Sequence, residues 1–125
     1  MASVKASSCA LFIVSVLLGF NLISALQPGD TESGICSWYG EPSEAGLTAN
    51  GEWFDGTDMT AAHKTLPFNS VVSVGYNGRT VSVRINDRGP FTPGRILDVS
   101  KRAGTDLGVI DKGIWDCTLT VISIP

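Results

Sequence analysis

The chain has 125 residues, of which 43% are hydrophobic and 17% are charged, a composition typical of a globular protein and not of a disordered or fibrous one. Twelve acidic residues outnumber nine basic ones, for a formal net charge of −3. We therefore do not expect nucleic acid as a partner, because phosphate binding needs a basic face, and a chain of this length is expected to hold a single domain.

Residues 1–25 have the pattern of a secretory signal peptide. The apolar run 11–20 reads LFIVSVLLGF, lies after Lys5 and is followed closely by Ser24 and Ala25. The run is too short for a membrane span, which takes about 20 residues. Cys9 precedes the run, whereas a lipid-bearing cysteine follows such a segment. We therefore expect a secreted protein with no stable membrane anchor.

Two cysteines remain after removal of the signal peptide, Cys36 and Cys117, near the two ends of the mature chain. In an oxidising compartment we expect them to form a disulfide that contributes about 2–4 kcal/mol to stability. Two separate buried thiols are the alternative if the chain stays in a reducing compartment. With these cysteines paired and His63 the only histidine, no zinc site can be assembled, and we expect no metal or other cofactor.

Alternation of apolar and polar residues with a period of two recurs along the mature chain and predicts short β-strands. Residues 26–33 read as a short polar leader, and the first strand is expected over 34–40 (GICSWYG). Residues 41–51 are rich in Gly, Pro, Ser and Asn, which predicts a loop. A further short strand is expected over 60–63.

The clearest prediction is a β-hairpin over 71–86, with Asn77 and Gly78 as its two-residue turn. The second strand of this hairpin has apolar residues on one face and polar residues on the other, and it delivers Asp87 at its end. Four arginines lie within a span of 17 residues that begins in this hairpin, which leaves open a local basic patch: Arg79, Arg84, Arg88 and Arg95.

The rest of the chain predicts a strand over 95–99, a short helix and a last strand over 114–124. Ser100 is placed to cap the helix, which runs to about Leu107 and ends at Gly108. About six short strands and one short helix favour an all-β closed barrel, because closure removes exposed sheet edges.

The groups able to do acid–base chemistry are His63 and four carboxylates, Glu52, Asp55, Asp87 and Asp98. Glu52 and Asp55 flank two aromatic residues, and acids beside aromatic rings are typical of sites that cleave sugars. Spacing alone does not distinguish this function from structural roles, in which the acids accept backbone hydrogen bonds or turn the chain and the histidine is buried and satisfied.

The order of several short motifs resembles the rare lipoprotein A (RlpA) family over about residues 34–124. The motifs are SWYG at 37–40, TANGEWFD at 48–55, TAAHKTLPF at 60–68, NGR at 77–79, VRINDRGPF at 83–91 and GRILDVS at 94–100. Each motif alone is weak, but the series in this order is specific. The resemblance implies that 34–125 form a six-stranded double-psi β-barrel with one short helix, a fold related to expansins and barwin-like domains.

The resemblance also implies a function and a set of site residues. Bacterial members of the family are lytic transglycosylases that cleave peptidoglycan and prefer glycan strands without stem peptides. By matching motif, the catalytic pair falls on Asp87 and His63, with Asp87 as the acid/base and His63 orienting it or sharing its proton. Substrate-binding roles are expected for Glu52, Asp55, Asp98, Trp38, Tyr39 and Arg88.

Four departures from the family pattern bear on the substrate. The chain has no lipid-attachment cysteine after the apolar run and no C-terminal peptidoglycan-binding repeat domain, its hairpin turn near Asn77 is short, and Cys36 and Cys117 are not part of the common pattern. We expect the protein to be a monomer whose partner is peptidoglycan. Cellulose and chitin are the alternative wall glycans. The alternative function is a non-hydrolytic, expansin-like protein that binds and loosens polysaccharide.

Overall fold

The computed structural model describes residues 25–125, so the predicted signal peptide lies outside the described residues except for Ala25. The elements are β1 (Thr31–Tyr39), the 3₁₀ helix η1 (Pro42–Glu44), β2 (Gly46–Leu47), β3 (Trp53–Phe54), β4 (Thr60–Ala62), β5 (Val71–Tyr76), β6 (Arg79–Asp87), β7 (Arg95–Ser100), α2 (Lys101–Leu107) and β8 (Ile114–Ser123). Within 25–125 no helix is long and apolar enough to cross a membrane.

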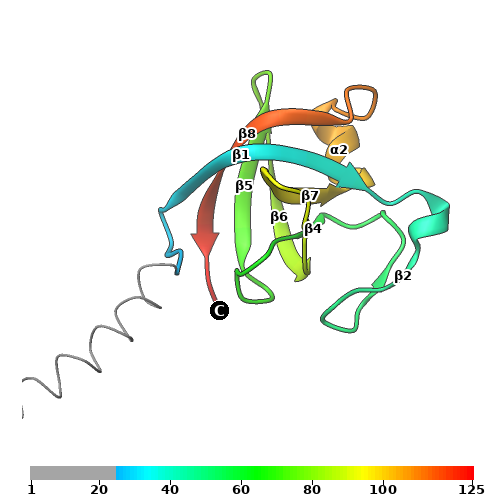
Figure 1. The fold of residues 1–125 in the computed structure, drawn as a ribbon, viewed down its shortest axis with the longest axis horizontal. Helices are drawn as coiled ribbons and strands as arrows, with labels where there is room; N and C mark the ends of the chain where they lie inside the picture. The colour runs from blue at the N-terminus through cyan, green and yellow to red at the C-terminus, as the bar shows by residue number, and fades with distance from the viewer. Residues whose placement is uncertain (1–24) are drawn as a thin grey trace, which may run out of the picture.

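Six strands close into a barrel, as expected. Their order is β1-β7-β4-β6-β5-β8, which the sequence did not predict. β1 pairs with β7 and β4 pairs with β6 in parallel, and the other neighbours in the barrel pair antiparallel. Figure 1 shows β1 and β8 side by side along the barrel, with α2 packed at one end and β2 standing off the barrel wall. β2 and β3 form a separate small hairpin.

The core lies inside the barrel and is built from alternate residues of its strands. Four alternate residues of β8 are buried, namely Trp115, Cys117, Leu119 and Val121. Residues of the other strands fill the same interior: Val72, Val74, Val83, Ile85, Leu97 and Val99. The polar residues between them face outward, which leaves the outer surface of the barrel available for binding.

The local predictions of turn and helix caps are confirmed. Asn77 and Gly78 both have positive φ, 51° and 83°, as a two-residue hairpin turn requires. Ser100 accepts a hydrogen bond from the amide of Ala103, and Gly108 ends the helix in the left-handed conformation. These features depend on neighbouring residues alone, so the sequence defines them well.

The structure differs from the expected elements near the N-terminus. β1 begins at Thr31, three residues before the expected start, because Thr31 and Ser33 pair with Thr120 and Thr118 of β8. The polar leader therefore contributes to the barrel wall. The expected loop over 41–51 contains η1 and β2, and β4 ends at Ala62, one residue earlier than expected. These elements form through partners distant in sequence, which periodicity does not reveal.

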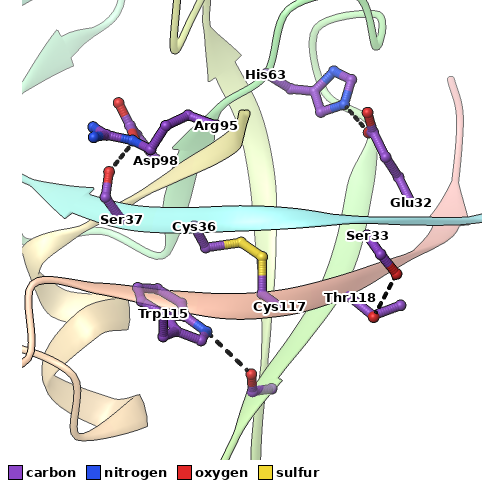
Figure 2. The surroundings of a disulfide bond; sticks show 11 residues. Glu32, Ser33, Cys36, Ser37, His63, Arg95, Asp98, Trp115, Cys117 and Thr118 are labelled. Carbon is purple, nitrogen blue, oxygen red and sulfur yellow. Dashed lines mark hydrogen bonds and ion pairs between the residues drawn. A yellow bond between two sulfur atoms is a disulfide. The ribbon is translucent and has the colours of Figure 1, made fainter. Parts of the chain in front are cut away.

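The expected disulfide between Cys36 and Cys117 is present, with the two Cα atoms 5.9 Å apart. Figure 2 shows it crossing from β1 to β8, where the two cysteines lie on neighbouring strands. Both cysteines are buried, so the bond lies within the core and ties the first strand of the barrel to the last.

Candidate active site

Asp87 ends β6 and its carboxylate is held by three hydrogen-bond donors. Oδ1 accepts from the amides of Ala49 and Arg88, both at 2.9 Å, and Oδ2 accepts from the hydroxyl of Tyr39 at 2.9 Å. The side chain is half-buried. Two residues distant in sequence and the next residue along the chain therefore fix this carboxylate while leaving part of it open to solvent.

Asp98 lies in the same cross-strand row as Asp87. Ala62 of β4 pairs with Asp87 on one side and with Asp98 on the other, so a single alanine separates the two acids. Paired residues point to the same face of a sheet. Asp98 accepts hydrogen bonds from the hydroxyl of Ser37 and, at 3.3 Å, from Arg95 (Figure 2). The structure thus brings two of the predicted acids together on one outer face of the barrel.

Glu52 lies immediately before β3 and belongs to a hydrogen-bond network that reaches Asn86, the residue before Asp87. Its two oxygens each accept a 2.9 Å bond from Arg84, and Oε1 also accepts from Nδ2 of Asn86 at 3.1 Å. The bond to Arg84, followed by that to Asn86, lowers the pKa of Glu52 to about 2. Glu52 is therefore a fixed anion that holds the β2–β3 hairpin against β6.

Asp55 lies beyond the hairpin and is fully exposed. It accepts hydrogen bonds from the hydroxyl and amide of Thr57, and these bonds, the hydroxyl first, lower the pKa of Asp55. Asp55 therefore caps a local turn. It does not belong to the hydrogen-bond network of Glu52.

Tyr39 links the β2–β3 hairpin to the carboxylate of Asp87. Its ring stacks on Phe54 with a centroid distance of 4.3 Å and an interplanar angle of 11°. Burial, and then the hydrogen bond to Asp87, raise the pKa of Tyr39 well above its ordinary value. The phenol therefore stays protonated, and its hydroxyl is a permanent partner for Asp87.

His63 approaches Asp87 through the backbone, while its ring points elsewhere. The amide of His63 donates to the carbonyl of Asp87 at 3.2 Å. The ring is buried, its Nδ1 accepts from the amides of Thr65 and Leu66, and its Nε2 lies 2.8 Å from Glu32 (Figure 2). Because Nδ1 is an acceptor, the ring proton sits on Nε2 and is donated to Glu32.

The two remaining predicted residues support the structure around the site. Arg88 donates to the carbonyl of His63 at 3.1 Å and lies 4.0 Å from the ring centroid of Phe68. Trp38 lies on the same face of β1 as Cys36, and Tyr39 lies on the opposite face. Nε1 of Trp38 donates a hydrogen bond to the carbonyl of Ile110, shortly after the helix ends. Strand alternation in the sequence already separates Trp38 from Tyr39, and that signal places Trp38 away from Asp87.

Sequence reasoning missed the roles of Arg84 and Ser37, which bind two of the candidate acids. The signal for Arg84 was its position two residues before Asn86, on the same face of a strand that ends at Asp87. Two of the four clustered arginines, Arg84 and Arg95, form ion pairs with acids. Within the described part of the chain no group of three or more His, Cys, Asp or Glu side chains is placed to hold a metal ion.

Comparison with known proteins identifies relatives over most of the chain. A family model described as lytic transglycolase matches residues 31–119. The endolytic peptidoglycan transglycosylase RlpA of Vibrio cholerae is 49% identical over 98 residues, which are 77% of this chain and 37% of that protein. The protein of the same name from Campylobacter jejuni is 46% identical over 96 residues, 75% of this chain and 35% of the relative. The chain thus spans little more than a third of the length of these relatives.

A solved structure supports the fold independently. The Streptomyces papain inhibitor matches with a TM-score of 0.66 over 79% of this chain and all of that chain, at 24% sequence identity. At this identity the match concerns the fold alone, which is the double-psi barrel that the sequence motifs implied. The chain therefore belongs to the lytic transglycolase family and, within it, to the RlpA-like double-psi β-barrels.

Proposed function

We propose that this chain is a secreted lytic transglycosylase that cleaves the glycan strands of peptidoglycan, leaves 1,6-anhydro-muramic ends and prefers strands without stem peptides. The observation that carries the proposal is the carboxylate of Asp87, half-buried and bonded to the hydroxyl of Tyr39. The names of the 46–49% identical relatives support the same substrate class.

The reaction needs one group that gives and then takes back a proton. In the first step the bond between the anomeric carbon and the glycosidic oxygen breaks, and protonated Asp87 gives its proton to the leaving oxygen. In the second step the 6-hydroxyl of the muramic residue bonds to the same anomeric carbon, and its proton returns to Asp87. No water is consumed. Tyr39 can keep its hydrogen bond to Asp87 in both protonation states of Asp87, because a hydroxyl donates to a carboxylate and accepts from a carboxylic acid.

His63 acts as a positioning residue in this proposal. Its backbone amide donates a hydrogen bond to the carbonyl of Asp87, and its ring accepts hydrogen bonds from the amides of Thr65 and Leu66. Of the two roles expected from the sequence, orienting Asp87 or sharing its proton, the contacts of the ring favour the first. Glu52 positions the β2–β3 hairpin, and the exposed side chain of Trp53 beside it offers an aromatic surface for sugar rings.

The test incubates the purified protein with peptidoglycan freed of stem peptides, and in parallel with cellulose and chitin, and searches the products for 1,6-anhydro ends by mass spectrometry. We expect anhydro products from peptidoglycan, and we expect Asp87→Asn to lower their rate at least 100-fold, the size of effect typical of a general acid. Asp111→Asn, in the exposed turn before β8, is the matched control. Binding without new ends supports the expansin-like alternative, and anhydro products from Asp87→Asn at the wild-type rate overturn the assignment of Asp87.

A further inference from the structure

An open groove of about 840 Å³ lies on the half of the barrel opposite Asp87. The candidate site uses the outer face of β1, β7, β4 and β6, whereas the groove runs over β1, β8 and the β5–β6 hairpin. Its hydrogen-bonding side chains come from β1, β6, β8 and the hairpin turn: Ser33, Asn77, Arg79, Thr80, Asp116 and Thr118. Its volume is within the range of binding pockets for small ligands.

Gly75 lies among hydroxyl side chains in the lining of the groove. Gly75 pairs with Thr80 on β6, and the antiparallel register of β5 with β8 puts Thr118 on its other side. Gly75 allows the two strands to approach closely, since an added Cβ would lie 2.9 Å from the carbonyl oxygen of Arg79. Its backbone forms part of the floor of the groove. The buried indole of Trp115 donates to the carbonyl of Gly75 at 3.3 Å and holds this floor in place (Figure 2).

The polar groups of the groove are pre-arranged for hydrogen bonding. The hydroxyl oxygens of Ser33 and Thr118 lie 2.7 Å apart and form a hydrogen bond, and both residues are exposed. Asp116 and Arg79 contribute one charge of each sign, and the other lining residues are uncharged. Hydroxyl, amide and carboxylate groups together supply both donors and acceptors, which is what the hydroxyl and acetamido groups of a sugar require.

We propose that this groove binds a segment of β-1,4-linked amino-sugar glycan as a second site, separate from the cleavage site. The choice of glycan rests on the proposed function, while the site itself rests on the groove. A second contact with the same polymer raises the effective concentration of glycan at Asp87. The second site therefore increases turnover of long or insoluble glycan and leaves turnover of short fragments unchanged.

The binding test is an NMR titration of the protein with chitohexaose, which lacks the muramic lactyl group and so serves as a probe of binding. We expect shifts of the amides of Gly75, Thr80 and Thr118 in addition to those near Asp87. Shifts confined to the surroundings of Asp87 overturn the proposal. The same shifts produced by raising the protein concentration without glycan also overturn it, because they identify a second copy of the chain as the occupant.

The variant that tests the role is the pair Thr80→Val and Thr118→Val, which removes two hydroxyls and keeps the shape and the strand preference of each residue. We expect about tenfold weaker binding to insoluble peptidoglycan, because the variant removes two hydroxyls that hydrogen-bond the glycan. Cleavage of short soluble fragments should be unchanged. Thr120→Val is the matched control, because Thr120 lies two residues along the same strand and does not line the groove.

The outcomes separate this inference from the proposed function. Loss of polymer binding by the double variant, with full cleavage of short fragments, supports the second site. Anhydro products with no effect of the double variant on polymer binding overturn the second site alone. Glycan binding at Gly75 and Thr118 without anhydro products overturns the transglycosylase activity and leaves the second site in place.

Discussion

The hydroxyl of Tyr39 donates a 2.9 Å hydrogen bond to Oδ2 of Asp87, across a separation of 48 residues. Tyr39 ends β1 and Asp87 ends β6, so the contact exists only when the barrel has closed. Phe54 of the β2–β3 hairpin stacks on the same tyrosine ring. The bond therefore couples the candidate acid both to the barrel and to the hairpin over it.

Replacing Tyr39 with Phe keeps the stack on Phe54 and removes only the hydroxyl. Hydrogen bonds to charged groups contribute about 1.5–3 kcal/mol, so we expect a 10- to 100-fold lower kcat with a KM close to that of the wild type. The measurement is the initial rate of anhydro-product release over a range of substrate concentrations. Tyr76→Phe is the control, because Tyr76 packs on Trp115 on the other half of the barrel. Both variants are assayed on short soluble fragments, since Tyr76 also lines the groove of the proposed second site. A Tyr39→Phe enzyme with the wild-type kcat would show that the hydroxyl has no part in the reaction.

The ring of His63 offers a prediction that distinguishes positioning from proton transfer. An asparagine at this position has its side-chain oxygen where Nδ1 of His63 lies, three bonds from Cα, and such a residue accepts the same two following amides in an Asx turn. We expect His63→Ala to lower the free energy of unfolding by about 2–4 kcal/mol, because it leaves buried amide groups unpaired. His63→Asn should recover most of that stability and most of the activity.

The measurements for His63 are urea unfolding and the rate of anhydro-product release on the same two variants. If the ring moved a proton in the reaction, His63→Asn would fold well and be as inactive as His63→Ala. Glu32→Gln is the companion variant, since an amide oxygen still accepts from Nε2. We expect it to keep the wild-type kcat.

The sequence predicted those parts of the fold that depend on neighbouring residues. The turn at Asn77 and Gly78 and the cap at Ser100 need only a few residues with the right backbone preferences, and both are confirmed. The family motifs also led to Asp87 and Glu52, which the structure brings together through Asn86. Contacts set by barrel closure are different, because their two partners are far apart in the chain.

The clearest example of a contact that could not be predicted is the one between His63 and Glu32. Glu32 lies in the segment expected to be a leader, and it reaches the ring only because β1 extends along β8 from Thr31. Nothing in the local sequence of either residue indicates the other. The direction of the ring, and with it the choice between the two roles of His63, therefore depends on tertiary structure.

The disulfide offers a prediction on stability. Cys36 and Cys117 are 81 residues apart, so their bond restricts a large loop of the unfolded chain. We expect the Cys36→Ala/Cys117→Ala variant to lose about 2–4 kcal/mol of unfolding free energy while it keeps its activity below its unfolding temperature. Guanidinium unfolding with and without reductant provides the measurement. Reductant should destabilise the wild type and leave the double variant unchanged, and an equal effect on both would exclude the disulfide as the cause.

The ion pair of Glu52 with Arg84 predicts a loss of stability in acid. The pKa of Glu52 is lowered from 4.5 to about 2 by the bonds from Arg84 and then Asn86. A carboxyl with a lowered pKa stabilises the folded state fully above pH 4.5, and this contribution declines as the pH falls to about 2. Because both side chains are more than a third exposed, solvent screening limits the contribution to about 1 kcal/mol.

The test compares the unfolding free energies of the wild type and Glu52→Gln in urea between pH 7 and pH 2. Glutamine keeps one acceptor for Arg84 and carries no charge, so the difference isolates the ionised state of the carboxyl. We expect the wild type to be more stable at neutral pH and the two proteins to converge as the pH approaches 2. A difference that stays constant over this range would mean that the hydrogen bonds, and not the charge, hold the β2–β3 hairpin against β6.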